Sequence, residues 1–290
     1  METKLIQITS VEDLLTKILS SHEARRGGEI YFRGISNRKF LNKAKVYREF
    51  KHKRHEGDLL SSLLMEAPEV FSSDKTVFEK LVRAQHHGLP TRLLDVSQNP
   101  LVALYFACSG ESDMDKDGAF YLFDIAAKRL KNFDSDIVSL IANMGMLREE
   151  ERKEISDCIA KAKKGEGSRN IDQEWFNDIK SVKRLVQFVR VEKPYFLNEI
   201  KAIDLAQFFL MRPKKSNKRI VAQSGAFIAS GVYGSLGQNS SKAFNISKFV
   251  IPFEHKQSIL DQLDVLNING RALFPEIDRQ AEYISNAYLT

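Results

Sequence analysis

The pattern of apolar and polar positions predicts a chain of helices mixed with short strands. Ser10 begins the first expected helix, in which Val11, Leu14, Leu15 and Ile18 form an apolar stripe. Helical spacing and start signals predict further helices at 56–70, 76–87, 149–164, 173–186, 198–210, 254–266 and 276–288. Runs of β-forming residues predict strands at 29–34, 118–124, 186–191 and 248–253, and two short strands within 217–227.

This mixture predicts an α+β fold, with a small mixed or antiparallel sheet and helices packed on it. We expect a single domain over residues 1–290. Residues 130–185 differ in character, because two charge-rich helical patterns flank the polar stretch KKGEGSRN, which is typical of a flexible connection. We therefore expect residues 130–185 to form a helical insertion or lobe on the core.

The composition allows a large core, since 43% of the 290 residues are apolar. Cys108 and Cys158 lack the spacing of a metal or redox site, and Cys108 is expected in the core. The first residues lack the pattern of a secretory signal, and no apolar run approaches the roughly 18 residues that span a bilayer. We therefore expect a soluble, cytoplasmic protein without a membrane partner.

The net charge is +6, from 44 basic and 38 acidic residues that are interspersed along most of the chain. It modestly favours a polyanionic partner or a phosphate-bearing ligand. The densest basic segments are 38–54 and 212–219. A solvated surface explains most of these charges, so charge alone defines no site.

The stretch 85–107, QHHGLPTRLLDVSQNPLVALYFA, joins a polar loop to an apolar helix. Asn99 is expected to cap that helix and Pro100 to occupy its first turn. A polar loop at a helix start suits an anion, because the first N–H groups lack partners and the helix dipole is positive there. A purely structural role fits equally well, with Asp95 and Asn99 as caps and Arg92 paired with Asp95.

Two glycines and an arginine extend the candidate site. In EIYFRGIS, Arg33 ends a predicted strand and can reach an adjacent cleft, and Gly34 lets a ligand or a backbone approach closely. Arg33 also fits a plain bridge to a carboxylate such as Asp95. Gly88 is expected to be the left-handed residue that ends the helix at 76–87.

His86 and His87 point about 100° apart on a helix and have no neighbour at metal-ligand spacing, so we expect no metal site. One of them suits a hydrogen bond to a ligand or proton transfer near neutral pH. Gln223 lies at the junction of the two short strands expected within 217–227. Its side chain either enters a shared cleft or satisfies a turn, and spacing leaves both open.

Two large enzyme classes lack support. The sequence holds no glycine-rich loop with a lysine, which disfavours a P-loop nucleotide hydrolase. It holds no GxSxG motif, and neither cysteine has a histidine nearby in the sequence, so serine or cysteine hydrolase chemistry has no support.

The segments QHHGLPTRLLD and NPLVALYFA resemble the central motif of the FRG-domain family of bacterial and phage proteins, which is named after an aromatic-Arg-Gly motif. Here that motif is Phe32-Arg33-Gly34. The resemblance continues in DGAFYLFD at 117–124, NKRIVAQSGAF at 217–227, the strand at 248–253 and ALFPEID at 272–278. The resemblance favours His86 over His87 as the histidine of the site. The family is largely uncharacterised, so the resemblance implies a site more than a chemistry.

A more distant likeness to ADP-ribosyltransferases implies an enzyme that transfers ADP-ribose or cleaves NAD, with NAD as the candidate substrate. In that fold an arginine on the first strand contacts the dinucleotide phosphates, and Arg33 is similar to it. Residues 91–106 look like the second strand and its helix. The third position, a catalytic glutamate, is occupied by Gln223, which cannot stabilise a ribosyl cation. Either Asp95 supplies the charge, or the protein binds a nucleotide without cleaving it, or the likeness fails.

The alternative is a non-catalytic module in phage or antiphage biology that binds nucleic acid or a protein. The basic segments support it, but the aromatic residues lie mainly in predicted core strands, so no stacking surface for bases is evident. The cofactor and the oligomeric state stay open. Under the first hypothesis a cleft binds an anionic nucleotide, with catalytic candidates His86, Asp95 and Gln223 and ligand-binding candidates Arg33, Gly34, Gln85, Gly88, Thr91, Arg92 and Asn99.

Overall fold

The computed structural model describes residues 6–22, 28–164, 172–236, 243–277, 280–281 and 285. The helices are α1 (Val11–His22), α2 (Phe50–Arg54), α3 (Glu56–Glu66), α4 (Val77–His86), α5 (Pro100–Cys108), α6 (Asp136–Asn143), α7 (Glu149–Lys164), α8 (Gln173–Asp178), α9 (Lys180–Glu192), α10 (Ala202–Leu205), α11 (Lys218–Ala222), α12 (Lys256–Val265) and α13 (Gly270–Leu273). The strands are β1 (Gly28–Ile35), β2 (Leu94–Ser97), β3 (Gly118–Ala126), β4 (Leu130–Asn132), β5 (Phe209–Arg212), β6 (Gly225–Ala229) and β7 (Phe244–Ile251). Most of KKGEGSRN and much of the helix expected at 276–288 lie outside the described residues.

The described strands form one sheet in the order β4-β5-β6-β2-β1-β3-β7. Every neighbouring pair is antiparallel except β4 and β5, which are parallel. The mixed sheet with packed helices confirms the predicted α+β class. The central strand β1 pairs with β3 along its whole length, but it pairs with β2 at one position, between Phe32 and Ser97.

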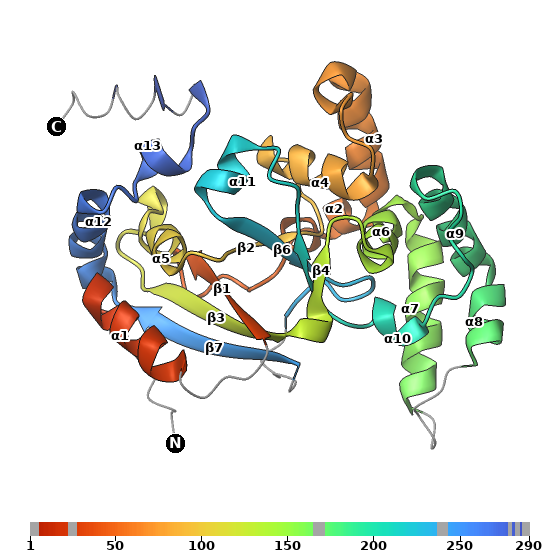
Figure 1. Cartoon of the computed structure of the whole chain (residues 1–290), viewed down its shortest axis with the longest axis horizontal. Coiled ribbons are helices and arrows are strands. Elements are labelled where there is room, and N and C mark those ends of the chain that lie inside the picture. The colour runs from red at the N-terminus through yellow and green to blue at the C-terminus, as the bar shows by residue number, and fades with distance from the viewer. Residues whose placement is uncertain are drawn as a thin grey trace.

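One face of the sheet is covered by α1, α5 and α12, which gather beside β3 and β7 in Figure 1. Phe32 and Phe120 from the strands pack there against Leu104 of α5 and Ile259 of α12. The α5 sequence predicts this burial, because a nearly all-apolar helix needs cover on more than one side. The helix begins as expected, with the Asn99 side chain accepting a hydrogen bond from the Leu101 N–H.

The helix pair α3 and α4 packs with α6 against β5 and β6. The start of α4 is fixed by a capping box, in which Thr76 and Glu79 each satisfy a backbone N–H group of the other. Gly88 follows α4 with a φ of +92°, which confirms it as the left-handed residue that ends this helix. The loop after Gly88 is therefore turned back toward β2.

Helices α6 to α10 share a separate group of buried residues. In Figure 1, α7, α8 and α9 lie at the end of the molecule opposite α1 and α12. Helix α6 contacts two groups of buried residues, because Ile141 packs with α4 and Leu140 packs with α7 to α10. We call α6–α10 the helical lobe; that the whole chain is one domain stays a prediction.

Two strand predictions are wrong. Residues 186–191 belong to α9, because buried Val182, Val186 and Val189 recur at the three- and four-residue spacing of a helix. Residues 218–222 form α11, since the Asn217 side chain accepts the Arg219 N–H at 2.8 Å and starts a helical turn.

The helix expected at 198–210 is mostly wrong as well. Only Ala202–Leu205 is helical, and Phe209–Arg212 forms strand β5. A short apolar run is compatible with either structure, and here it is buried on both faces between β4 and β6.

Candidate functional site

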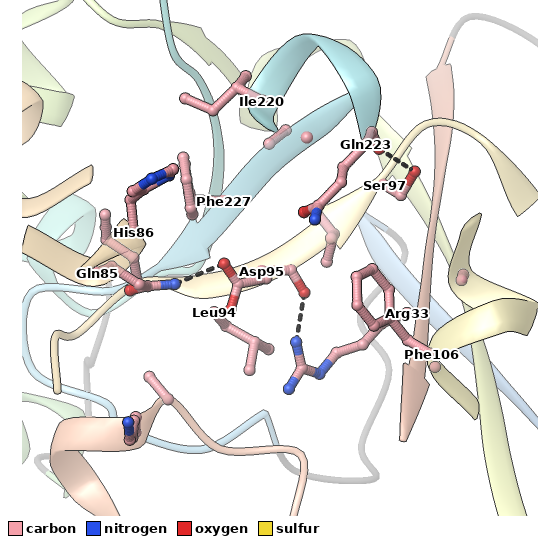
Figure 2. Close-up of a pocket in the computed structure, with 18 of the residues that line it drawn as sticks. Arg33, Gln85, His86, Leu94, Asp95, Ser97, Phe106, Ile220, Gln223 and Phe227 are labelled. Atoms are coloured by element: carbon pink, nitrogen blue, oxygen red, sulfur yellow. Dashed lines mark hydrogen bonds between the residues drawn. The ribbon is translucent and has the colours of Figure 1, made fainter. Parts of the chain in front are cut away.

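A pocket of about 440 Å³ lies where β1 and β2 separate. Beyond the single pair Phe32–Ser97, β2 continues its ladder with β6 on its other side, so β1 and β2 diverge. Residues of both strands line the opening, and α4, α5 and α11 complete its walls (Figure 2). We call this cavity the central pocket. A split between neighbouring strands gives side chains access to space that a continuous ladder would close.

Arg33 lies in the gap between the two strands. Its Nη1 group donates a hydrogen bond of 2.6 Å to the backbone carbonyl of Asp95, so the side chain joins the strands where their backbones no longer pair (Figure 2). Its Nε–H is buried and has no hydrogen-bond partner among the described residues. Burial lowers the pKa of Arg33; Asp95 opposes this shift and Arg48 adds to it. A buried N–H without an acceptor is unfavourable, and an anionic ligand would supply one.

Asp95 presents its carboxylate to the same space. Its Oδ1 atom accepts a hydrogen bond of 2.6 Å from the Gln85 amide, and Gln85 in turn accepts one from the Thr91 hydroxyl. The Asp95 residue is exposed, and its Oδ2 atom has no hydrogen-bond partner in the described part of the chain. The chain Thr91–Gln85–Asp95 therefore fixes one carboxylate oxygen and leaves the other for a ligand.

Gln223 reaches the pocket from the end of α11. Its amide Nε2 donates to the Leu273 carbonyl at 3.1 Å, and its own backbone carbonyl accepts the Ser97 hydroxyl at 2.7 Å. Gln223 thus ties β2 and α13 together beside the cavity, and its bond to Ser97 of β2 is drawn in Figure 2. Both interpretations of this glutamine hold in part, because it lines the pocket and also satisfies a backbone group.

His86 lines the pocket with its ring held on both sides. Its Nδ1 atom lies 3.1 Å from the Asn217 amide Nδ2, which can only donate, so the proton of the neutral ring is on Nε2. That Nε2 lies 3.2 Å from Oε1 of Glu276, whose carboxylate oxygens are buried without a hydrogen bond among the described residues. Burial lowers the pKa of His86; Glu276 raises it, and Arg219 is among the cations that lower it.

The central pocket carries an excess of positive charge. Asp95 is the carboxylate among its described lining residues, whereas the cationic side chains that line it are those of Arg33, Lys45, Arg48 and Arg219. Arg219 is held over the Phe274 ring, 4.7 Å from its centroid, and lies 3.9 Å from Glu276. The lining also includes apolar side chains, among them Phe106 and Phe227. Cationic and apolar side chains in one cavity suit a ligand with an anionic and a flat apolar part.

The structure brings most of the predicted site residues together. Those that line the central pocket are Arg33, Gly34, Gln85, His86, Gly88, Asp95 and Gln223. They come from three segments that lie far apart in the sequence, 33–34, 85–95 and Gln223.

Three predicted site residues lie outside the pocket lining. Thr91 is fully buried and acts on the pocket through Gln85. Arg92 is 2% exposed and points away to a buried pair with Glu56, at 2.7 Å between Nε and Oε1. The expected pairing of Arg92 with Asp95 is therefore wrong. Asn99 is occupied as the cap of α5.

Gly34 lines the pocket, but the contact that requires a glycine is with the protein itself. A Cβ atom at this position would overlap the Ala103 carbonyl oxygen and the Ala107 nitrogen of α5. Gly34 therefore lets β1 lie against α5. Gly88 contributes its carbonyl, which accepts a hydrogen bond of 2.9 Å from the Lys45 ammonium group.

Sequence reasoning missed four charged residues of this site. Lys45 and Arg48 line the pocket from within the basic segment 38–54, where spacing does not distinguish them from their neighbours. Arg219 lies two residues after Asn217, which caps α11 by accepting the Arg219 N–H. The capping residue Asn217 was the signal in the sequence that could have placed Arg219 at the start of a helix. Glu276 lies inside the motif ALFPEID, but nothing in the sequence links it to His86.

Part of the chain that forms this pocket matches a known protein family. Residues 28–116 match the FRG domain. This FRG region contains β1, β2, α4 and α5, and with them Phe32-Arg33-Gly34 and the central motif. Neither the curated proteins nor the solved structures searched include a match to the chain. The resemblance beyond residue 116 stays a prediction.

The described residues offer no support for a metal site, a reactive cysteine or a membrane-spanning helix. No group of three or more His, Cys, Asp or Glu side chains there is arranged to hold a metal ion. Cys108 is fully buried, as predicted, and burial raises the pKa of its thiol to about 12. No helix in the described part of the chain has both the length and the apolar character to cross a membrane.

Proposed function

We propose that the central pocket of this FRG-domain protein binds an anionic nucleotide. The observation that carries the proposal is Arg33, whose guanidinium lies in the pocket with a buried Nε–H that lacks an acceptor. A phosphate oxygen is a suitable acceptor, because charge-assisted hydrogen bonds to arginine are strong and directional. Lys45 and Arg48 also line the pocket and add positive charge to it.

The shape of the pocket supports the same ligand class. A volume of about 440 Å³ lies within the range of small-ligand sites. Apolar lining residues such as Phe106 offer a surface for a base, and the cationic lining residues offer partners for a phosphate. This combination matches a nucleotide better than a purely apolar ligand or a bare inorganic ion.

Calorimetric titration of the whole chain with AMP, ADP-ribose and NAD tests the proposal. Arg33→Gln is expected to weaken binding by about tenfold or more, because it removes a charged hydrogen-bond donor. Arg190→Gln, on the exposed side of α9, is the matched control and should leave the dissociation constant unchanged. Absence of binding at millimolar nucleotide, or equal binding by Arg33→Gln, would refute the proposal.

Cleavage of NAD is a second candidate function, and Asp95 favours it. Its carboxylate faces the pocket that holds Arg33, with one oxygen fixed by Gln85 and the other unpaired among the described residues. Cleavage of the bond between nicotinamide and ribose releases neutral nicotinamide and leaves positive charge on the ribose, which a nearby carboxylate stabilises until water adds to the same carbon and loses a proton. Gln223 is neutral and cannot do so, and both nitrogens of the His86 ring already face protein groups.

Release of nicotinamide from NAD, followed by chromatography, tests this second function. Asp95→Asn should lower the release rate by about 100-fold or more while NAD still binds. Asp178→Asn on the helical lobe is the control for loss of one carboxylate. Nucleotide binding without nicotinamide release would leave the protein a binding module.

A further inference from the structure

Residues 38–54, which we call the basic strip, concentrate positive charge beside the central pocket. The strip holds eight lysines and arginines and one acidic residue, Glu49. Arg38 and Arg54 each lie 3.4 Å from a carboxylate, that of Asp117 and Glu149 respectively. The lysines of the strip have no carboxylate partner among the described residues. Among the described residues, most of the positive charge of the strip is therefore not neutralised.

The basic strip is fixed to the pocket wall. Phe40, Lys45 and Arg48 line the central pocket, and α2 begins two residues after Arg48. Val46 is fully buried, and its N–H donates to the Thr91 carbonyl at 3.2 Å. An anionic chain that leaves the pocket on this side meets the strip directly.

Two aromatic rings of the strip face solvent. Phe40 is 48% exposed and Phe50 is 67% exposed. These two rings therefore lie outside the core strands, in which most of the aromatic residues were expected. Exposed rings among cations match a polymer whose flat bases follow its phosphates, whereas an acidic peptide would use the cations alone.

We infer that the natural ligand is the end of a single-stranded nucleic acid. Its terminal nucleotide occupies the central pocket, and the nucleotides before it lie along the basic strip, with phosphates near the lysines and bases on Phe40 and Phe50. The inference rests on the proposed nucleotide site and names the class of molecule that fills it.

The test compares a fluorescent twelve-nucleotide single strand with AMP, both titrated into the whole chain at several salt concentrations. We expect the oligonucleotide to bind at least tenfold more tightly than AMP, with a strong dependence on salt. Lys51→Glu/Lys53→Glu changes two exposed residues of α2 that lie outside the pocket lining. This variant should bind the oligonucleotide at least tenfold more weakly, and its affinity should depend less steeply on salt. Its affinity for AMP should be unchanged.

Lys180→Glu/Lys183→Glu makes the same change of charge on exposed α9 and should leave oligonucleotide binding within about twofold. The inference is overturned if AMP binds and the oligonucleotide binds no more tightly, a result that leaves the proposed function intact. It is also overturned if both charge variants weaken the oligonucleotide equally, or if polyglutamate competes as well as the oligonucleotide. If neither AMP nor the oligonucleotide binds, the proposed function fails too.

Discussion

Arg92 and Glu56 show how a polar residue of the central motif serves the scaffold. The guanidinium meets the carboxylate through two hydrogen bonds of 2.7 and 2.8 Å, and Nη1 donates to the carbonyls of Ile141 and Gly231. Burial alone lowers the pKa of Arg92, but Glu56 outweighs it and the net shift is upward. The pair therefore joins the motif to α3 and α6 inside the protein.

Arg92→Met leaves the buried Glu56 carboxylate with Arg152, at 3.6 Å, as its remaining cation, and is expected to lower the free energy of unfolding by about 3 kcal/mol. Urea unfolding followed by circular dichroism measures the loss. The matched control is Arg54→Met, because Arg54 pairs with Glu149 at 3.4 Å on the surface and its loss should cost less than about 1 kcal/mol. Equal small losses in the two variants would contradict the structural role of Arg92.

Glu276 and His86 give a prediction that depends on pH. Burial lowers the pKa of His86 from 6.5, and Glu276 is the neighbour that opposes this, while Arg219, His87 and Arg83 add to the lowering. Glu276→Gln should therefore lower the His86 pKa further. As the pH falls below 6.5, the unfolded chain takes up this proton first, so the folded state loses stability, and the variant should lose more than the parent protein.

An NMR titration of the imidazole signals measures the His86 pKa, with the exposed His55 as an internal reference. A His86 pKa that is unchanged or raised in Glu276→Gln would show that the carboxylate does not act on the ring.

The structural roles of individual residues could be predicted best where the chemistry is local. The cap Asn99 and the turn residue Gly88 could be identified because their partners lie within a few positions. The roles of Arg92 and Glu276 could not, since their partners are 36 and 190 residues away, and spacing carries no information about such contacts.

At the scale of elements, the contact of β1 with α5 positions the pocket. Gly34→Ala would place a methyl group against the α5 backbone, which cannot move aside as a side chain can. We expect a loss of about 3 kcal/mol or more in the free energy of unfolding, because β1 must shift away from the helix.

Gly225→Ala is the control for Gly34→Ala, since the nearest atom to its added Cβ would be the Ile220 carbonyl oxygen at 3.7 Å, an ordinary contact. Its effect should be within about 1 kcal/mol. Thermal and urea unfolding of both variants provide the comparison. A Gly34→Ala protein as stable as the control would mean that β1 does not lie this close to α5.

The elements that the sequence predicted best are those with a long repeating pattern. Helix α4 and strand β3 each carry a clear periodicity or a long run of β-formers. Strands β2, β4 and β5 have three or four residues each, too few to show alternation, and none was predicted as it stands. A similarly short pattern makes residues 218–222 resemble a strand in the sequence, although they form α11.

At the scale of the whole molecule, the FRG region provides the middle of a sheet whose sides come from later residues. Within residues 28–116, β1 and β2 pair at one position. The strands with which β1 and β2 pair along their length, β3 and β6, lie outside this range. Lys256 connects α12 to the FRG region, because its fully buried side chain donates hydrogen bonds of 2.7 Å to the carbonyls of Ser36 and Asp113.

These connections predict that residues 28–116 do not fold alone. Two strands joined at one pair leave unsatisfied edges, and α5 loses the cover of α1 and α12. The isolated fragment should show a collapsed ¹H–¹⁵N NMR spectrum and no cooperative unfolding, whereas the whole chain shows both a dispersed spectrum and a cooperative transition. Dispersed signals from the fragment would refute this and would make 28–116 a domain of its own, with the later strands added to a finished core.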